Sequence, residues 1–244
     1  MKLYSGPLSL FTAKVRIALD EKGVAYEKVE VPFSRTKGYE PKHPDVLAIN
    51  PKGQVPVIVD EGLALYDSTI ILEYLEDRHP TPALYPTDVR ERARCRQLEA
   101  AADEVFFPNV IELIQEVFYK PDPATRDAKR VAAAIERLGV VYRRLEGELE
   151  GELEGREYLC GAFGVADIGW FLSIGFATSL GAPPDPSLSA IGAWLARVAA
   201  RPSVQREQEG MRAAVLALSN ETTRGTPSPF STRQSRVEPL RPAR

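Results

Sequence analysis

The side chains best suited to binding a small peptide-like molecule lie at one predicted strand start and one predicted helix start. Pro56 stands inside a predicted strand over residues 55–59. Because proline cannot donate to a sheet ladder, we expect Val55 to expose its backbone N–H and C=O groups there, at a bond where the cis isomer is accessible. Ser68 precedes an apolar run at helical spacing and is the expected N-cap of a helix over residues 68–78. The N–H groups and dipole of such a helix start favour a carboxylate, so an extended peptide-like ligand would suit this surface.

Composition limits the classes of partner. The chain has 244 residues, 44% of them hydrophobic, which is enough for one large domain or two small ones that fold unaided. A formal net charge of −3 gives no electrostatic case for nucleic acid or an anionic membrane as the main partner. No apolar stretch approaches the roughly 20 residues of a membrane helix. The segment before Pro7 lacks the features of a signal peptide. We therefore expect a cytosolic protein.

The cysteines and histidines do not indicate a metal site. Cys95 and Cys160 stand far apart in the sequence and have no metal-ligand partners nearby, so two ordinary buried thiols are expected instead of a disulfide or a zinc site. His43 and His79 each precede a proline, which is typical of loops and helix ends.

Hydrophobic periodicity predicts two domains of different class. A small α/β domain is expected over residues 1–79, and a proline-rich linker over 80–88 leads to an all-α domain over 89–218. The segment 219–244 is rich in Ser, Thr, Pro and Arg, and we expect it to be a disordered tail.

The order of elements in the first domain is βαβ followed by ββα. Its predicted strands are 2–5, 25–31, 55–59 and 63–66, and its predicted helices are 10–22 and 68–78. The region 32–50 is expected to be a loop with one short helical turn. The second domain is expected to begin with two long helices over 91–119 and 125–153.

Several short motifs, taken in order, resemble the glutathione S-transferase superfamily. They are the strand, turn and helix of residues 3–19, the Lys-Gly-Val-Ala-Tyr segment of residues 22–26, the segment 50–56, and Asp67 with Ser68. The resemblance covers about residues 1–215. It implies a thioredoxin-like N-terminal domain followed by an all-helical C-terminal domain, in agreement with the division above. It also implies a homodimer that uses glutathione as cosubstrate.

The resemblance further implies how glutathione is held. The bond before Pro56 is expected to be cis, and the backbone of Val55 is expected to pair with the cysteinyl part of glutathione. The residues assigned to the γ-glutamyl end are Gln54, Asp67 and Ser68. Some classes use a basic residue for the glycyl carboxylate, and Lys42 is the nearest match in spacing, although an exposed surface lysine would give the same pattern.

Ser9 is the residue expected to meet the glutathione sulfur. In serine-using classes the serine precedes the Arg of the Val-Arg-Ile-Ala-Leu helix by seven residues, and Ser9 stands at this distance before Arg16; tyrosine-using classes place their hydroxyl four residues earlier, at Ser5 here. A free thiol has a pKa of about 8.5, and the thiolate is the nucleophile. A hydroxyl donor at a helix N-terminus would stabilise that thiolate. The alternative is that Ser9 only caps the helix, and one residue can serve both purposes.

The electrophile pocket of this superfamily lies between the domains. The candidates to line it are Phe11, Phe106 and Phe107, although aromatic residues on a long helix are more often core than pocket. A helix is predicted to start at Gly164, with Asp167 beside its first-turn N–H groups. The family usually has Ser or Thr in place of Gly164, so we expect this cap to be weaker by about a few tenths of a kcal/mol.

The expected function is a cytosolic glutathione S-transferase that adds the glutathione thiolate to a small apolar electrophile. Alternatives within the superfamily are a glutathione-dependent isomerase, a dehalogenase or an ether-cleaving enzyme. Isomerase-type members have a Ser-Ser-Cys stretch where this chain has Ser9, Leu10 and Phe11, which argues against that branch. A non-catalytic interaction protein of the same fold, as in starvation-type regulators of RNA polymerase, stays open because fold does not fix function.

Overall fold

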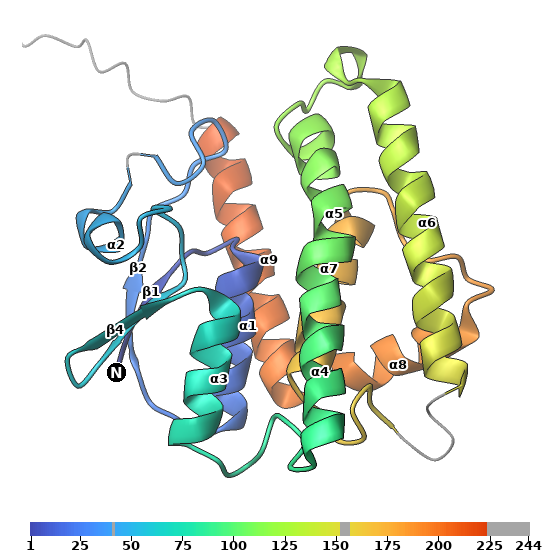
Figure 1. Ribbon diagram of the computed structural model, residues 1–244. Coiled ribbons are helices and arrows are strands. Elements are labelled where there is room, and N and C mark those ends of the chain that lie inside the picture. The colour runs from blue at the N-terminus through green and yellow to red at the C-terminus, as the bar shows by residue number, and fades with distance from the viewer. Residues whose placement is uncertain (41, 152–156, 224–244) are drawn as a thin grey trace, which may run out of the picture.

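The computed structural model describes residues 1–40, 42–151 and 157–223, and an α/β part and a helical part lie side by side in it (Figure 1). The elements of the first part are β1 (Lys2–Ser5), α1 (Leu10–Glu21), β2 (Glu27–Glu30), α2 (Pro44–Ile49), β3 (Val57–Asp60), β4 (Leu63–Tyr66) and α3 (Ser68–Arg78). This order confirms the predicted thioredoxin-like domain, including the short helical turn before β3.

The four strands form one mixed sheet in the order β2-β1-β3-β4. β1 and β2 are parallel, whereas β3 is antiparallel to both β1 and β4. In this register Tyr4 lies beside Val57, and Val57 lies beside Tyr66. The end of β1, the start of β3 and the end of β4 therefore meet at one edge of the sheet, and the segments that follow or precede them are brought together there.

Two strand boundaries differ from the prediction. β2 is limited to Glu27–Glu30, and β3 begins at Val57, after Pro56, because proline has no N–H for the ladder. α1 ends at Glu21, one residue before the predicted end, and Lys22 is its C-cap. Gly23 follows with φ of 62°, a left-handed conformation that glycine adopts without strain.

The helical part contains two long antiparallel runs followed by three further helices. Its elements are α4 (Val89–Ala101), the π turn η1 (Ala102–Phe106), α5 (Phe107–Leu113), the π turn η2 (Ile114–Phe118), the 3₁₀ turn η3 (Pro123–Thr125), α6 (Ala128–Gly151), α7 (Val165–Ser179), α8 (Ser189–Ala199) and α9 (Pro202–Thr223). The predicted helix over 91–119 is therefore one run with two π turns in it. The first π turn adjoins Pro108, which cannot donate to the helical ladder.

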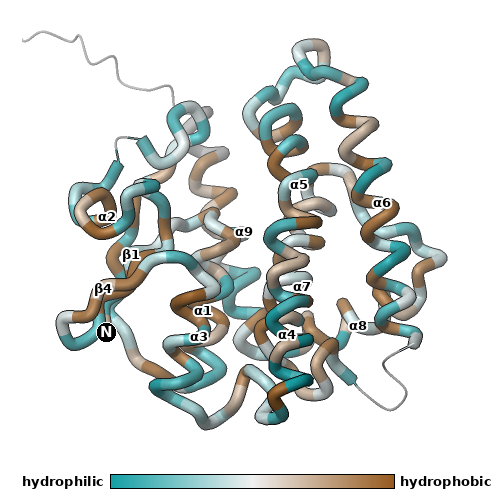
Figure 2. Tube along the Cα trace, viewed as in Figure 1, coloured by the Kyte–Doolittle hydropathy of each residue, from teal (hydrophilic) through white to brown (hydrophobic). Residues whose placement is uncertain are grey.

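Packing of α6 illustrates how sequence periodicity forms the core of the helical part. Hydrophobic and hydrophilic residues alternate in bands along α6 (Figure 2). The hydrophobic residues of α6 that are buried are Ala134, Leu138, Tyr142, Leu145 and Leu149. Their spacing of three, four and seven residues places them on one stripe of the helix, which faces the core.

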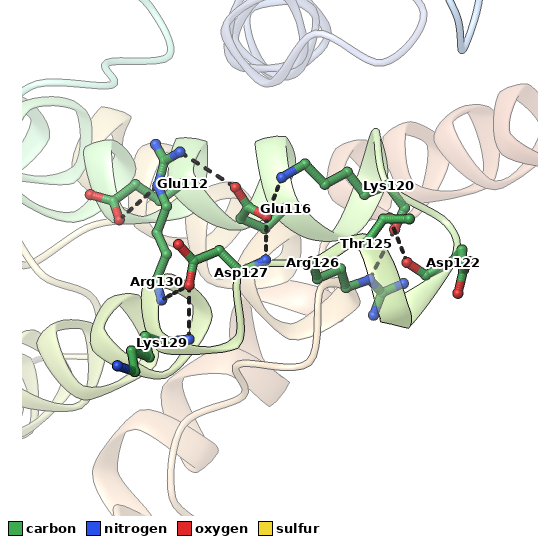
Figure 3. Close-up of polar contacts among 9 residues, drawn as sticks. All are labelled: Glu112, Glu116, Lys120, Asp122, Thr125, Arg126, Asp127, Lys129 and Arg130. Atoms are coloured by element: carbon green, nitrogen blue, oxygen red, sulfur yellow. Dashed lines mark hydrogen bonds and ion pairs between the residues drawn. The ribbon is translucent and has the colours of Figure 1, made fainter.

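The connection between the two long runs is fixed by a polar cluster (Figure 3). The Glu116 carboxylate accepts from Lys120 Nζ at 2.6 Å and from the backbone N–H of Asp127 at 2.9 Å. Asp127 in turn accepts from the first-turn N–H groups of Lys129 and Arg130, and so caps α6. Bonding to Lys120 lowers the pKa of Glu116, so the cluster keeps its charges at neutral pH.

The start of α7 confirms the predicted cap and corrects the interpretation of Gly164. Asp167 accepts from the backbone N–H groups of Gly164 and Leu159, at 3.0 Å each, and from Trp194 Nε1 at 2.8 Å. Burial raises the pKa of Asp167 to about 6. A Cβ at Gly164 would lie only 2.4 Å from the carbonyl oxygen of Leu84. Glycine is therefore required by a close backbone approach, and a serine would not strengthen this cap.

The C-terminal helix α9 returns from the helical part to pack on α1 (Figure 1). It extends to Thr223, so residues 219–223 of the predicted tail are helical, while the remainder of that prediction lies outside the described residues. In the described part of the chain, no helix combines the length and hydrophobicity needed to cross a membrane.

Candidate functional site

Ser9 lies in the turn between β1 and α1 and caps α1. Its Oγ accepts from the backbone N–H of Thr12 at 3.1 Å, and the residue is half-buried. This bond uses a lone pair of the hydroxyl, so its proton remains available for donation to a group beyond the helix start. The cap is confirmed, and it is compatible with the donor function expected for Ser9.

The start of α3 differs from the prediction by one residue. Asp67, not Ser68, is the N-cap, and its Oδ1 accepts from the backbone N–H of Thr69 at 3.1 Å. Asp67 has φ of 76° and its side chain is exposed, whereas Ser68 is the first helical residue and is buried. The carboxylate of Asp67 satisfies a first-turn N–H group, which a serine cap was expected to do.

The segment before β3 is shaped by Asn50. The Asn50 side chain donates to the carbonyl oxygen of Gln54 at 2.7 Å and accepts from the backbone N–H of Lys52 at 3.0 Å. The Val55–Pro56 peptide bond is cis, as the resemblance implies. Val55 precedes the first ladder residue of β3, and the Gln54 side chain is exposed.

Lys42 lies beside this segment. The aliphatic part of its side chain is 3.4 Å from the position that a Cβ would occupy on Gly53, so the lysine stem packs on the turn that leads to Gln54. Its Nζ pairs with Glu40 at 3.3 Å, and the pair is partly exposed. The structure thus brings Lys42 next to the predicted glutathione segment, and its function there stays a prediction.

The sheet register gathers these residues at one place. Ser9 follows the end of β1, Pro56 precedes the start of β3, and Asp67 follows the end of β4, all at the same edge of the sheet. Two helix starts, those of α1 and α3, face this edge. Polar side chains and first-turn N–H groups therefore converge where a small polar molecule with a carboxylate could bind.

The three aromatic candidates for a pocket are in different environments. The rings of Phe11 and Phe107 meet edge to face, with centroids 5.0 Å apart, across the boundary between the two parts of the molecule. Phe106 is fully buried and packs against Tyr142 and Trp170, so it belongs to the core of the helical part. Its ring lies on the core side of the helix, which favours the core alternative, and a pocket function for Phe106 stays a prediction.

A buried charged network adjoins the two helix starts, and the sequence analysis did not identify it. Lys14 Nζ contacts a carboxylate oxygen of Glu99 and lies 2.7 Å from Asp103 Oδ2. The hydroxyl of Thr69 donates to Glu99, with its oxygen 3.0 and 3.1 Å from the two carboxylate oxygens. The available signal was a lysine on the buried stripe of α1, four residues after Leu10.

Two carboxylates share one ammonium in this network. Burial alone would lower the pKa of Lys14, but the attraction of Glu99 and Asp103 is larger and raises it. The pKa of Asp103 is also raised, because burial outweighs the attraction of Lys14. Asp103 Oδ1 is buried and has no hydrogen-bond partner. The network therefore has two carboxylates for one ammonium, a formal excess of one acidic group.

The described residues contain no group of three or more side chains suited to a metal ion. Cys95 and Cys160 are both free. A hydrogen bond with the Cys95 thiol, together with burial, raises the pKa of Cys160. The two cysteines are therefore neighbours in space, which their separation in the sequence did not indicate.

Comparison with protein families gives two matches that together cover most of the chain. Residues 3–83 match the N-terminal domain of glutathione S-transferase, and residues 106–202 match its C-terminal domain.

Similar proteins have different functions. Glutathione S-transferase 3 of Zea mays is 31% identical over 214 residues, which are 84% of this chain and 92% of that protein. A stringent starvation protein A homolog of Coxiella burnetii is 37% identical over 118 residues, 48% of this chain and 52% of the homolog. Maleylacetoacetate isomerase of Pseudomonas aeruginosa is 46% identical over 101 residues, 41% of this chain and 47% of the isomerase. This chain thus matches only about half the length of the last two relatives.

Among solved structures, a sphingomonad glutathione S-transferase complexed with glutathione superposes on 86% of this chain and 98% of its own. The TM-score is 0.68 and the identity 30%. The fold, both family matches and the nearly full-length relative from Zea mays agree. The chain belongs to the glutathione S-transferase family.

Proposed function

We propose that this protein is a glutathione transferase in which Ser9 stabilises the glutathione thiolate for attack on a small apolar electrophile. The observation that carries the proposal is the capped but still protic Ser9 hydroxyl at the N-terminus of α1. The helix dipole and one hydroxyl donor both favour a negative charge there. Glutathione is the cosubstrate, as in the related sphingomonad complex.

The binding assignments are those that the family resemblance implies, and the convergence of these segments at the sheet edge supports them. The backbone of Val55 pairs with the cysteinyl part of glutathione. The residues proposed for the γ-glutamyl end are Gln54, Asp67 and Ser68. Lys42, whose stem packs on the adjacent turn, is the residue proposed for the glycyl carboxylate. Its pairing with Glu40 would have to open or adjust when glutathione binds.

The reaction requires one deprotonation and one bond-forming step. The thiol proton leaves to solvent, and a sulfur lone pair forms the new S–C bond. In a substitution, the leaving group departs with its bonding pair; in a conjugate addition, the displaced electron pair takes up a proton from water. Ser9 donates a hydrogen bond to the sulfur throughout and never attacks the electrophile. Phe11 and Phe107 supply apolar surface for the electrophile at the domain boundary.

We also propose that the enzyme is a cytosolic homodimer. Exposed apolar side chains lie on β4 and α3 and on α4 with the π turn after it; they are Leu63, Tyr66, Ile70, Val89 and Val105. Burying them between two copies would remove apolar area from water. A reducing compartment suits the two free cysteines.

Titration of the ultraviolet thiolate absorbance of bound glutathione tests the function. In the wild type we expect a thiol pKa at least about one unit below the free value near 8.5. In Ser9→Ala we expect it to return toward that value, with about tenfold slower conjugation near neutral pH for each unit regained.

Ser5→Ala is the matched control for this titration. Ser5 is fully buried and its Oγ already accepts from Arg16 at 2.7 Å, so the loss of its hydroxyl should leave the thiol pKa unchanged. If the thiol pKa rose in Ser5→Ala but not in Ser9→Ala, the hydrogen-bond donor would be Ser5, at the position that tyrosine-using classes employ. Glutathione binding without a lowered pKa would instead indicate a scaffold or sensor, and no binding would overturn the proposal.

Two other functions have specific observations in their favour. The identity with maleylacetoacetate isomerase supports an isomerase that uses the same thiolate, although Leu10 and Phe11 replace the residues typical of that branch. The starvation-protein homolog supports a non-catalytic interaction protein. The thiolate titration distinguishes a non-catalytic interaction protein from a transferase or an isomerase. Assays with a chlorodinitrobenzene and with a cis-configured diketo acid then distinguish the transferase from the isomerase.

A further inference from the structure

The network of Lys14, Thr69, Glu99 and Asp103 lies between the two parts of the molecule. Lys14 projects from α1, and Thr69 from the first turn of α3, whereas Glu99 and Asp103 come from α4 and the π turn that follows it. The Lys14 side chain is 0% exposed and that of Glu99 is 1% exposed. The pair of Lys14 and Glu99 is therefore buried at the boundary between the two domains, while the Asp103 side chain stays 13% exposed.

The same carboxylate touches both helices that carry the proposed glutathione residues. The Glu99 carboxylate accepts hydrogen bonds from the Lys14 ammonium and from the Thr69 hydroxyl. Lys14 lies five residues after Ser9, and Thr69 directly follows Ser68. Thr69 also donates its backbone N–H to Asp67. A single side chain of the helical domain thus links the second turn of α1 to the first turn of α3.

Lys14 is the group that makes this arrangement possible. Without its ammonium, two carboxylates four residues apart on one helical face would be buried side by side and would repel each other. A Cβ on Gly169 of α7 would lie 3.9 Å from Lys14 Cε, so the lysine is also enclosed from the α7 side. The position of the Lys14 side chain is therefore set by packing between α1, α4 and α7, and the Lys14 ammonium in turn holds the Glu99 carboxylate.

We propose that Lys14 and Thr69 are positioning residues for glutathione, acting through Glu99. Lys14 holds the Glu99 carboxylate in place, and Glu99 holds Thr69, which sets the position of Asp67 and Ser68 at the start of α3. In this proposal Lys14, Thr69 and Glu99 act without touching the glutathione sulfur. This inference rests on the proposed function, because it concerns the binding of the same cosubstrate.

Thr69→Val tests the inference with little risk to folding, because valine has the shape of threonine and lacks only the hydroxyl. We expect the dissociation constant of this variant for glutathione, measured by calorimetry, to rise about tenfold. This change corresponds to about 1.4 kcal/mol, which is close to the lower limit for a hydrogen bond to a charged group. Thr69→Ser restores the hydroxyl and should restore affinity. The rate at saturating glutathione should be retained in both variants, since the sulfur contact is unchanged.

Glu21→Gln is the matched control at the other end of α1. Glu21 forms a partly buried ion pair with Arg201 at 2.6 Å, and this pair also joins α1 to the helical part, but far from the start of the helix. The variant should lose stability without losing affinity for glutathione. Equal affinity in Thr69→Val and the wild type would overturn the positioning inference alone. An equal loss of affinity in Glu21→Gln would also overturn it, because general loosening of the domain boundary would explain both. Absence of binding in the wild type would overturn the proposed function and the inference with it.

Discussion

The two ends of α1 are both attached to the helical part by ion pairs, but their charge balance differs. Near its C-terminus, Glu21 alone is bound by the guanidinium of Arg201 and the hydroxyl of Ser203. Near its N-terminus, the ammonium of Lys14 is shared by Glu99 and Asp103. The first contact is neutral and fully paired, whereas the second keeps an excess negative charge in a buried place.

The pKa directions express the same contrast. Burial would raise the pKa of Glu21, but its bonds to Arg201 and Ser203 are stronger in sum and lower it. For Asp103, burial prevails over Lys14 and raises the pKa. A contact that only joins two domains needs no excess charge. The unfavourable burial of Asp103 near Ser9 agrees with the proposal that the N-terminal network positions a site, because proteins retain such local conflicts at functional places.

The largest expected effect is that of Lys14→Met. Removal of the ammonium leaves Glu99 and Asp103 buried without a cation, and breaking a buried pair in this way costs about 3–5 kcal/mol. Urea unfolding should report this loss as a lower midpoint. A loss below about 1 kcal/mol would mean that the carboxylates escape to water or take up protons easily, and the contrast between the two ends of α1 would disappear.

A smaller effect is expected for Glu21→Gln, about 1–2 kcal/mol, because hydrogen bonds to charged groups are lost at a partly exposed position. The folded-state pKa of Glu21 lies below its unfolded value, so its stabilising contribution is complete above about pH 4.3 and is lost as the pH falls through the folded pKa. The difference in unfolding free energy between the wild type and Glu21→Gln should therefore be constant from pH 7 to 5 and shrink in more acidic buffer. A difference that grows toward low pH would contradict the pairing.

The smallest effect is expected for Asp103→Asn, below about 1 kcal/mol at neutral pH, since an asparagine oxygen still accepts from Lys14. The stability difference between the wild type and Asp103→Asn should depend on pH with the sign opposite to that for Glu21→Gln. Because the folded-state pKa of Asp103 is raised, the folded protein binds the proton more tightly, and the stability of the wild type relative to Asp103→Asn should fall as the pH rises from about 4 toward the raised pKa. Parallel pH profiles for Asp103→Asn and Glu21→Gln would show that both ends of α1 are electrostatically alike.

Local sequence patterns predicted the elements better than the contacts between them. The limits of α3 and β4 were correct and the end of α1 before Gly23 was within one residue, because capping, periodicity and turn residues act over a few positions. The cap at Asp67 was displaced by one residue, since Asp and Ser are equally good caps and only the backbone decides between them. The sequence left open whether Phe106 belongs to the core or to a pocket, because the side of a long helix that faces the core depends on its neighbours.

The sequence by itself determined that this chain has an α/β domain followed by a helical one, and it offered Ser9 as a cap of the first helix. The division follows from periodicity, and the thioredoxin-like class follows from the family resemblance of short motifs. Only the tertiary structure decided that Lys14, Thr69 and Glu99 meet, that Gly164 is required by Leu84, and that Cys95 lies beside Cys160. Contacts between residues distant in the chain depend on how helices pack across the domain boundary, and no local pattern encodes that geometry.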